Sequence, residues 1–199
     1  MTRFLAIVGL LGLASLLGGC AAVVVGAGAA AGYGAYEDRR STGTQVEDQR
    51  IEMRVGSAID QRWGFKVHVN ATSYNRSVLI TGEVPDAATR DEVEKLIAAV
   101  PGVRTLSNEL AVGPASSLAA RTGDTVITSN VKTRFLGARN FNALHVKVVT
   151  EAGVVFLMGM VTELEANAAT EIARTTDGVK KVVKVFEYCK SGETICRPA

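Results

Sequence analysis

The two histidines have the most versatile side-chain chemistry in this 199-residue chain, and they lie 77 positions apart, at His68 and His145. Imidazole serves in metal sites and in general-base catalysis. A four-ligand zinc site is not expected, however, because the three cysteines form no Cys-x-x-Cys pair. No serine stands in a Gly-x-Ser-x-Gly sequence. We therefore interpret both histidines as polar residues on strand faces and predict no catalytic site, no metal and no cofactor.

The N-terminal segment carries the clearest chemical signal. After Arg3, no charged residue occurs for 33 positions, and an apolar run of 14 residues starts at Phe4. About 20 residues are needed to span a bilayer. The run ends in Leu-Gly-Gly-Cys at Cys20, which resembles the lipobox of bacterial lipoproteins. The resemblance implies that residues 1–19 are a signal peptide and that Cys20 carries the lipid anchor. An uncleaved membrane helix over residues 4–35 is the alternative.

The residues behind this cysteine indicate a tether and a location. Residues 20–45 are apolar and rich in glycine as far as Tyr36, and we interpret them as a tether, helical or disordered, with a packing helix as the alternative. Several acyl chains on one residue give a stable anchor. Ala21 stands where enterobacterial lipoproteins of the inner membrane tend to carry Asp. The expected location is therefore the outer membrane, facing the periplasm.

The other two cysteines, Cys189 and Cys196, lie in a C-terminal tail over residues 189–199. Because the periplasm is oxidising, an even pair favours a disulfide, with residues 190–193 forming the turn between them. Two free thiols are the alternative.

The sequence between tether and tail consists of two copies of one unit. Gly82 and Gly159 occupy matching places in apolar segments 77 positions apart, and the pairs at Gly102 and Gly178 are 76 apart. The units cover residues 46–113 and 124–188, joined by a linker over 114–123.

Each unit shows the same succession of patterns. Apolar residues recur at helical spacing in 51–59 and 127–135, and short alternating or apolar segments follow them as strands. Asp86, and Thr162 with Glu165, are expected to cap the second helix of each unit. The first two strands are joined tightly and should be antiparallel, whereas a crossover helix connects the second strand to the third. The predicted fold class is α+β: two tandem αββαβ domains, each a three-stranded sheet covered by two helices.

These units resemble BON domains, in their Gly-x-Val after an apolar strand and their later Gly-Val before the last strand. The tract DRRSTGTQVEDQRIEMRV, the segment VVFLMGMVTELEA and the lipobox are similar to those of dual-BON outer-membrane lipoproteins. The resemblance implies a non-enzymatic periplasmic lipoprotein that supports outer-membrane integrity, binds anionic phospholipid through its second BON domain and gathers at the division site. It implies a membrane partner and no nucleic acid.

The residues themselves point to the same half of the chain. Residues 46–113 hold 8 basic and 10 acidic residues, and residues 114–188 hold 9 and 7. The second unit is thus the better partner for an anionic surface. On its first helix, residues with the register of Ile127 face the core. The expected phospholipid-binding residues lie on or beside the other side: Val126, Ser129, Lys132, Thr133, Leu136 and Arg139. An ordinary helix with two exposed apolar residues is the alternative.

A protein-interaction scaffold, acting in outer-membrane protein assembly, cell-wall remodelling or division, is the rival function. The last strand of the second unit has apolar residues on both faces, namely Val182, Val183, Val185 and Phe186. Such a strand needs a second cover, which either the first unit or a partner protein supplies.

Replacing Cys20 with Ala should abolish lipidation, because the thiol is the expected site of attachment. Metabolic labelling with a fatty acid and membrane fractionation measure this. Label retained on the Cys20→Ala protein would contradict the assignment.

Overall fold

The computed structural model describes residues 38–190 and Cys196. The expected signal peptide 1–19, the lipidated Cys20 and most of the tether 20–45 lie outside the described residues. The chain divides into a unit that ends at Asp38 and a compact unit that starts at Arg39. No described helix combines the length and hydropathy that crossing a membrane requires.

The predicted order of elements, αββαβ, is confirmed in both repeats. The first repeat consists of α3 (Thr42–Arg62), β1 (His68–Tyr74), β2 (Ser77–Val84), α4 (Ala87–Ala98) and β3 (Thr105–Val112). The second consists of α5 (Leu118–Leu136), β4 (Lys147–Glu151), β5 (Val154–Val161), α6 (Glu163–Arg174) and β6 (Lys181–Tyr188). Short 3₁₀ turns, Gly64–Lys66 and Ala143–His145, precede β1 and β4.

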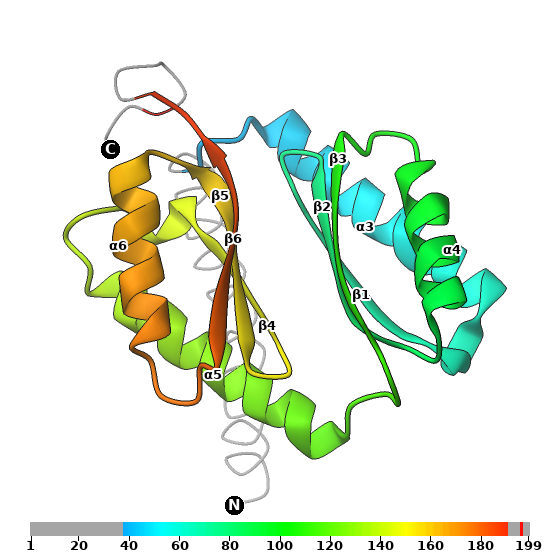
Figure 1. The fold of residues 1–199 in the computed structure, drawn as a ribbon. Helices are drawn as coiled ribbons and strands as arrows, with labels where there is room; N and C mark the ends of the chain where they lie inside the picture. Colours follow the sequence, from blue (N-terminus) through cyan, green and yellow to red (C-terminus); the bar gives the residue numbers. More distant parts are fainter. Residues whose placement is uncertain (1–37, 191–195, 197–199) are drawn as a thin grey trace, which may run out of the picture. The chain divides into compact units, whose positions relative to one another are not determined.

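Each repeat forms one three-stranded sheet with its hairpin strand at one edge. The orders are β1-β2-β3 and β4-β5-β6. The hairpin pairs are antiparallel, as predicted. The pairs formed across the crossover helices are parallel. In the first repeat α3 and α4 cover one face of the sheet (Figure 1), where Ile51, Val55, Ile80 and Ile97 form its core. Phe135, Val131 and Leu157 belong to the corresponding core of the second repeat.

The N-terminal caps fix where the helices start. Asp86 accepts a hydrogen bond from the Thr89 amide, and Thr162 with Glu165 forms a capping box, both as predicted. Helix α5 starts at Leu118, six residues earlier than the second domain was expected to, because the Ser117 hydroxyl accepts from the Ala120 amide. The connection therefore differs from the predicted linker 114–123, whose second half is helical. In the same way α3 starts at Thr42, inside the range assigned to the tether.

Gly82 and Gly159 are required by close approach of the backbone. A Cβ on either would lie 2.0 or 2.2 Å from the carbonyl oxygen of His68 or His145. The two histidines are therefore equivalent in the backbone, but the strand-face prediction was wrong for His145. Its side chain is buried within a 3₁₀ turn, with Nδ1 3.7 Å from Glu165 Oε1, because the segment that leads into β4 folds inward. His68 is the first residue of β1 and is half-buried.

The two sheets pack on each other through the faces that their own helices leave uncovered. Tyr74 and Leu79 of the first repeat form one apolar cluster with Phe156, Met158 and Met160 of the second. Val183 and Val185 pack against this cluster, whereas Val182 and Phe186 pack against the core under α5 and α6. The second cover that β6 was expected to need is therefore the first repeat.

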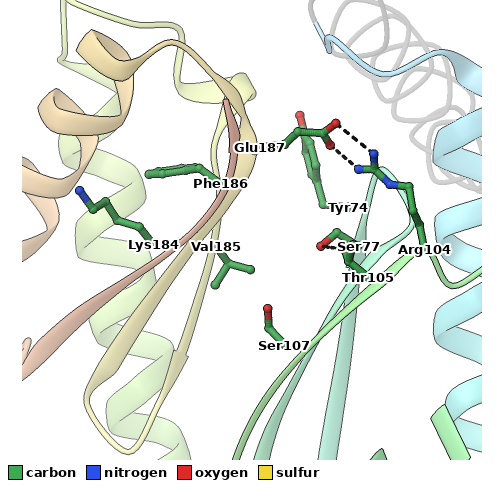
Figure 2. A pocket seen from close by; sticks show the side chains of 10 residues that line it. Tyr74, Ser77, Arg104, Thr105, Ser107, Lys184, Val185, Phe186 and Glu187 are labelled. Atoms are coloured by element: carbon green, nitrogen blue, oxygen red, sulfur yellow. Dashed lines mark hydrogen bonds and ion pairs between the residues drawn. The ribbon is translucent and has the colours of Figure 1, made fainter. Parts of the chain in front are cut away.

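Polar contacts surround this apolar cluster. Glu187 of β6 accepts a hydrogen bond of 2.7 Å from the Asn75 amide group and pairs with Arg104. Figure 2 shows this pair beside a cavity of about 440 Å³ between β3 and β6. Lys147 of β4 donates to Glu52 of α3 at 3.0 Å. Burial opposes ionisation of Glu187, but the bonds from Arg104 and Asn75 outweigh it and lower its pKa.

The segment before α3 is held on the second repeat by Arg39. Its guanidinium donates to the Met160 carbonyl oxygen and to both carboxylate oxygens of Glu165, each at 2.8 Å. The Arg39 and Glu165 side chains are only 4% and 12% exposed. Burial raises the pKa of Glu165, but the hydrogen bonds from Arg39 and the Thr162 amide outweigh it and lower the pKa to about 2.

Beyond β6, the structure joins Cys189 to Cys196 by a disulfide, with the two Cα atoms 6.1 Å apart. The Cys189 amide donates to the Val161 carbonyl oxygen at 3.1 Å, so the start of the tail continues alongside β5. Cys196 is buried.

Replacing Glu165 with Gln should destabilise the protein by about 3 kcal/mol, because it leaves the buried Arg39 charge without a carboxylate. The parent should also lose stability as the pH falls from 4.5 towards 2, since the lowered pKa favours folding only while Glu165 is ionised. Urea unfolding in neutral and acidic buffers measures both effects. Glu163→Gln, in the same helical turn but exposed, is the matched control. Equal acid sensitivity of parent and Glu165→Gln would contradict the assignment.

Candidate functional site

Helix α5 presents one face to the core and the other to solvent. Val131 and Phe135 are buried, and Ile127 packs against the same core. Arg134 connects the end of the helix to α6 and to the turn that follows it, because it donates to the Ile172 carbonyl oxygen at 2.8 Å and to the Thr176 hydroxyl at 2.7 Å. These contacts fix the rotation of α5 about its axis, and so determine which side chains face away from the core.

A buried aspartate fixes the position of α5 against the sheet. Both carboxylate oxygens of Asp124 accept hydrogen bonds from the hairpin turn between β4 and β5, from the amides of Ala152 at 2.9 Å and Gly153 at 2.8 Å. Asp48 does the same in the first repeat, where the turn residues are Asn75 and Arg76. Sequence reasoning treated these acids only as charges. Their separation of 76 positions, matching the repeat, was the signal that could have identified them.

The outward face of α5 carries large apolar side chains. Val126 is 54% exposed and Leu136 is 75% exposed. Ser129, Lys132 and Thr133 are exposed on the same helix. Arg139 is also exposed, two residues beyond the cap at Gly137. All six residues predicted from the sequence are thus accessible and lie on or just beyond α5.

Sequence reasoning missed the apolar residue at the other end of this face. Leu118 is 80% exposed. Leu118 lies nine residues before Ile127 and Leu136 lies nine residues after it. At about 100° per residue, both leucines therefore lie on the side of the helix opposite Ile127. Leu118 was overlooked because residues 114–123 were assigned to the linker. Ser117, a favourable N-cap directly before it, was the available signal.

The outward face of α5 is uniformly neutral or basic. Asp124 is the single acidic residue between Leu118 and Leu136, and it is turned inward. Helix α3 is different, because its exposed Met53 is accompanied by ion pairs of Arg50 and Arg54 with Glu47, at 3.6 and 3.0 Å. Of these two helices, α5 is therefore the one on which exposed apolar residues stand beside basic side chains on a face without acids.

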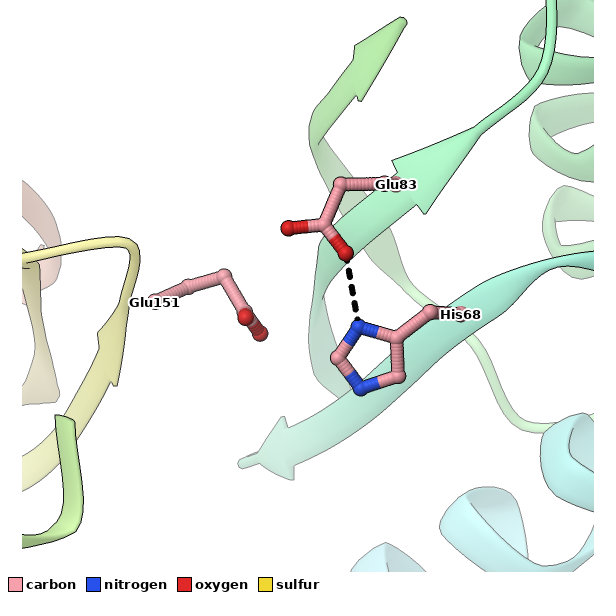
Figure 3. Close-up of side chains that lie close together, drawn as sticks. All are labelled: His68, Glu83 and Glu151. Carbon is pink, nitrogen blue, oxygen red and sulfur yellow. Dashed lines mark hydrogen bonds and ion pairs between the residues drawn. The ribbon is translucent and has the colours of Figure 1, made fainter. Parts of the chain in front are cut away.

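A second cluster has the residue types of a divalent-metal site. His68, Glu83 and Glu151 offer ligand atoms within 4.8 Å of one another (Figure 3). Hydrogen bonds already engage them: His68 Nδ1 and Glu83 Oε2 lie 2.8 Å apart, and Glu151 accepts from Asn70 and Thr81 at 3.0 and 3.2 Å. We interpret the cluster as a link between the sheets. No sequence pattern indicated this cluster, since its members come from different repeats.

Glu83 is also connected to the segment that leads into α5. The Ser116 amide donates to its carboxylate at 3.0 Å. Burial opposes its ionisation, but the hydrogen bonds from Ser116 and His68 outweigh this effect, so its pKa is lowered. The cluster therefore holds the backbone at Ser116, directly before the cap at Ser117, and in this way helps to place the start of α5.

Comparisons with known proteins agree with this architecture. The BON domain model matches residues 47–114 and 123–190. The chain is 43% identical over 181 residues to "Outer membrane lipoprotein DolP" of Haemophilus influenzae, covering 90% of this chain and 93% of that protein. It is 36% identical to a "21 kDa hemolysin" of Actinobacillus pleuropneumoniae, covering 76% and 79% of the two chains. It is 31% identical to "Osmotically-inducible protein Y" of Escherichia coli, covering 76% and 78%.

Among solved structures, the chain is similar to CdsD, a structural protein of the type III secretion system of Chlamydia trachomatis. The similarity covers 70% of this chain and 92% of that one, at 11% identity and a TM-score of 0.30.

Replacing Asp124 with Ala should destabilise the protein by about 2 kcal/mol, because the amides of the hairpin turn, one of them buried at Gly153, lose a charged acceptor. Thermal unfolding measures the effect. Asp177→Ala removes an exposed acid of the same repeat and should leave the midpoint unchanged. Equal midpoints for the two variants would show that Asp124 does not hold α5 in place.

Proposed function

Because this chain belongs to the BON-domain family, as a non-enzymatic outer-membrane lipoprotein of the DolP kind, we propose that its second domain binds anionic phospholipid through the outward face of α5. One observation carries the proposal: exposed leucine and valine side chains share this face with lysine, while the single acid of the helix is buried. An apolar face with cations beside it suits the boundary between acyl chains and headgroups.

The geometry suits a helix that lies in the plane of the membrane surface. Leu118 and Leu136 are 18 residues apart, which is about 27 Å along the helix axis. They share one angular position, with Val126 between them in the sequence. All three side chains would enter the interface together, while Lys132 and Arg139 would remain at the level of the headgroups.

The magnitude expected is modest. Each Lys or Arg near an anionic surface contributes about 1 kcal/mol, so Lys132 and Arg139 together give a preference of roughly tenfold to thirtyfold for anionic over neutral bilayers. The preference should decrease as salt concentration rises. A weak contact is sufficient, because a lipid anchor already raises the local concentration of membrane around the domain.

The role we propose for this contact is support of outer-membrane integrity from the periplasmic side, at the division site. The family resemblance supports this role, and a preference for anionic lipid would direct the domain to particular patches of membrane. The observation that suggested the rival scaffold function no longer requires a protein partner. The second face of β6 that suggested a protein partner is covered by the first repeat through Val183 and Val185.

A soluble chain of residues 38–199 should bind vesicles rich in phosphatidylglycerol, and the double change Val126→Glu and Leu136→Glu should abolish binding. All three apolar clusters lie within this range, and it keeps Arg39 and the cap at Ser41. Both altered side chains are exposed, so folding should persist. Co-sedimentation with vesicles at several salt concentrations measures binding.

The matched control changes the exposed Val46 and Met53 of α3 to Glu, and this variant should bind like the parent. If the α5 variant also binds like the parent, the contact lies elsewhere. If the parent binds no vesicles, the scaffold becomes the better interpretation.

A further inference from the structure

An apolar groove lies beside the C-terminal end of α5. Its volume is about 390 Å³, within the usual range for small-molecule sites. Phe135 and Leu136 line it from the helix, Ala143 and Leu144 from the 3₁₀ turn, and Tyr74 from the first repeat. The groove is therefore built by three separate segments and opens beside the face that we assign to the membrane.

The groove exists because the connection from α5 to β4 is longer than its counterpart. Ten residues separate Leu136 from Lys147, against five between Arg62 and His68. The longer segment is fixed at two points. Phe141 packs edge-on against Phe135 with ring centroids 5.0 Å apart, and the Asn142 side chain accepts from the Leu144 amide at 2.9 Å.

This fixed segment places two large apolar side chains at the mouth of the groove. Leu136 is 75% exposed and Leu144 is 43% exposed, although Val146 below them is only 6% exposed. Exposed apolar groups that continue into a buried apolar lining favour an apolar ligand that enters from outside.

Positive charge surrounds the same opening. Arg40, Lys132 and Lys147 all line the groove. Arg40 pairs with Asp48 at 2.8 Å and Lys147 pairs with Glu52 at 3.0 Å, so these two charges are balanced. The exposed Lys132 ammonium adds net positive charge at the rim. The ligand that fits is therefore amphiphilic, with an anionic head beside Lys132.

We propose that this groove takes one acyl chain of an anionic phospholipid, with the lipid phosphate at Lys132. The inference rests on the proposed function, because the groove continues the outward face of α5 through Leu136. It goes further in predicting a stoichiometric site for a single lipid, which surface adsorption does not require. The first repeat takes part through Tyr74, so the site needs both repeats packed together.

The probe is lysophosphatidylglycerol below its critical micelle concentration, added to the chain of residues 38–199. Amide chemical shifts around Ala143 and Leu144 should change in a saturable manner that fits one lipid per chain. Ala143→Trp, which fills the groove without adding charge, should weaken binding at least tenfold. Lys132→Gln should weaken it about fivefold, the factor equivalent to one headgroup-level charge.

Two further variants keep the test decisive. Leu144→Asp places a charge at the exposed mouth and should weaken binding even if Ala143→Trp fails to fold. Val126→Glu, which lies outside the groove, should bind the lysolipid like the parent but bind vesicles less well. If Ala143→Trp folds and binds like the parent, the groove is not the site and the inference is overturned, whereas vesicle binding by the parent would still support the proposed function. Absence of both activities in the parent would remove both.

Discussion

A three-stranded sheet with both helices on one face leaves its other face without a cover, and the rest of this structure depends on how that face is buried. Leu79 on β2 and Met158 on β5 are completely buried although neither belongs to its own helix-covered core. Burying large apolar side chains is worth about 2 kcal/mol each. Because one repeat alone would expose this face to water, the two repeats are expected to be stable as a pair rather than singly.

Packing of the two sheets also explains where the polar side chains between the repeats lie. Asn70, Asn75 and Arg104 of the first repeat meet Glu151 and Glu187 of the second around the edge of the apolar cluster. A carboxylate that loses contact with water when the sheets pack requires hydrogen-bond donors, and both Glu151 and Glu187 have them. The same packing brings Tyr74 to the groove under Leu144, so the proposed lipid site is a consequence of how the repeats associate.

The sequence was sufficient wherever local pattern determines structure. The αββαβ order, the caps at Asp86 and Thr162 and the inward register of Val131 could all be predicted, because hydrophobic periodicity and capping act over a few residues. The start of α5 could not, since residues 118–123 lack an apolar stripe and only Ser117 marks the boundary. Contacts such as Asn70 with Glu151 were also inaccessible, because they depend on the packing of two repeats that the sequence only shows to be similar.

The same distinction applies to the candidate site. Exposure of Val126 and Leu136 follows from helical register, whereas the inward turn of Asp124 depends on a hairpin that lies 28 residues further along the chain. The inward orientation of Asp124 keeps the exposed face of α5 positively charged. An exposed carboxylate at this position would offset one of the two basic residues assigned to the headgroups. Asp48 makes the same contacts with its hairpin turn, but they do not leave α3 with a face free of acids, since Glu47 and Asp60 remain on that helix.

Arg39 connects this site to the expected anchor. Its bonds to Met160 and Glu165 hold the beginning of the folded part on the second repeat, although the next helix belongs to the first. From Cys20 to Arg39 there are 19 residues, which can reach at most about 65 Å. A connection of that length sets the effective concentration of membrane surface near the domain. It does not determine which face of the domain contacts the membrane. Orientation must then come from the surface of the domain, and α5 offers apolar and basic groups on the repeat where the chain enters the fold.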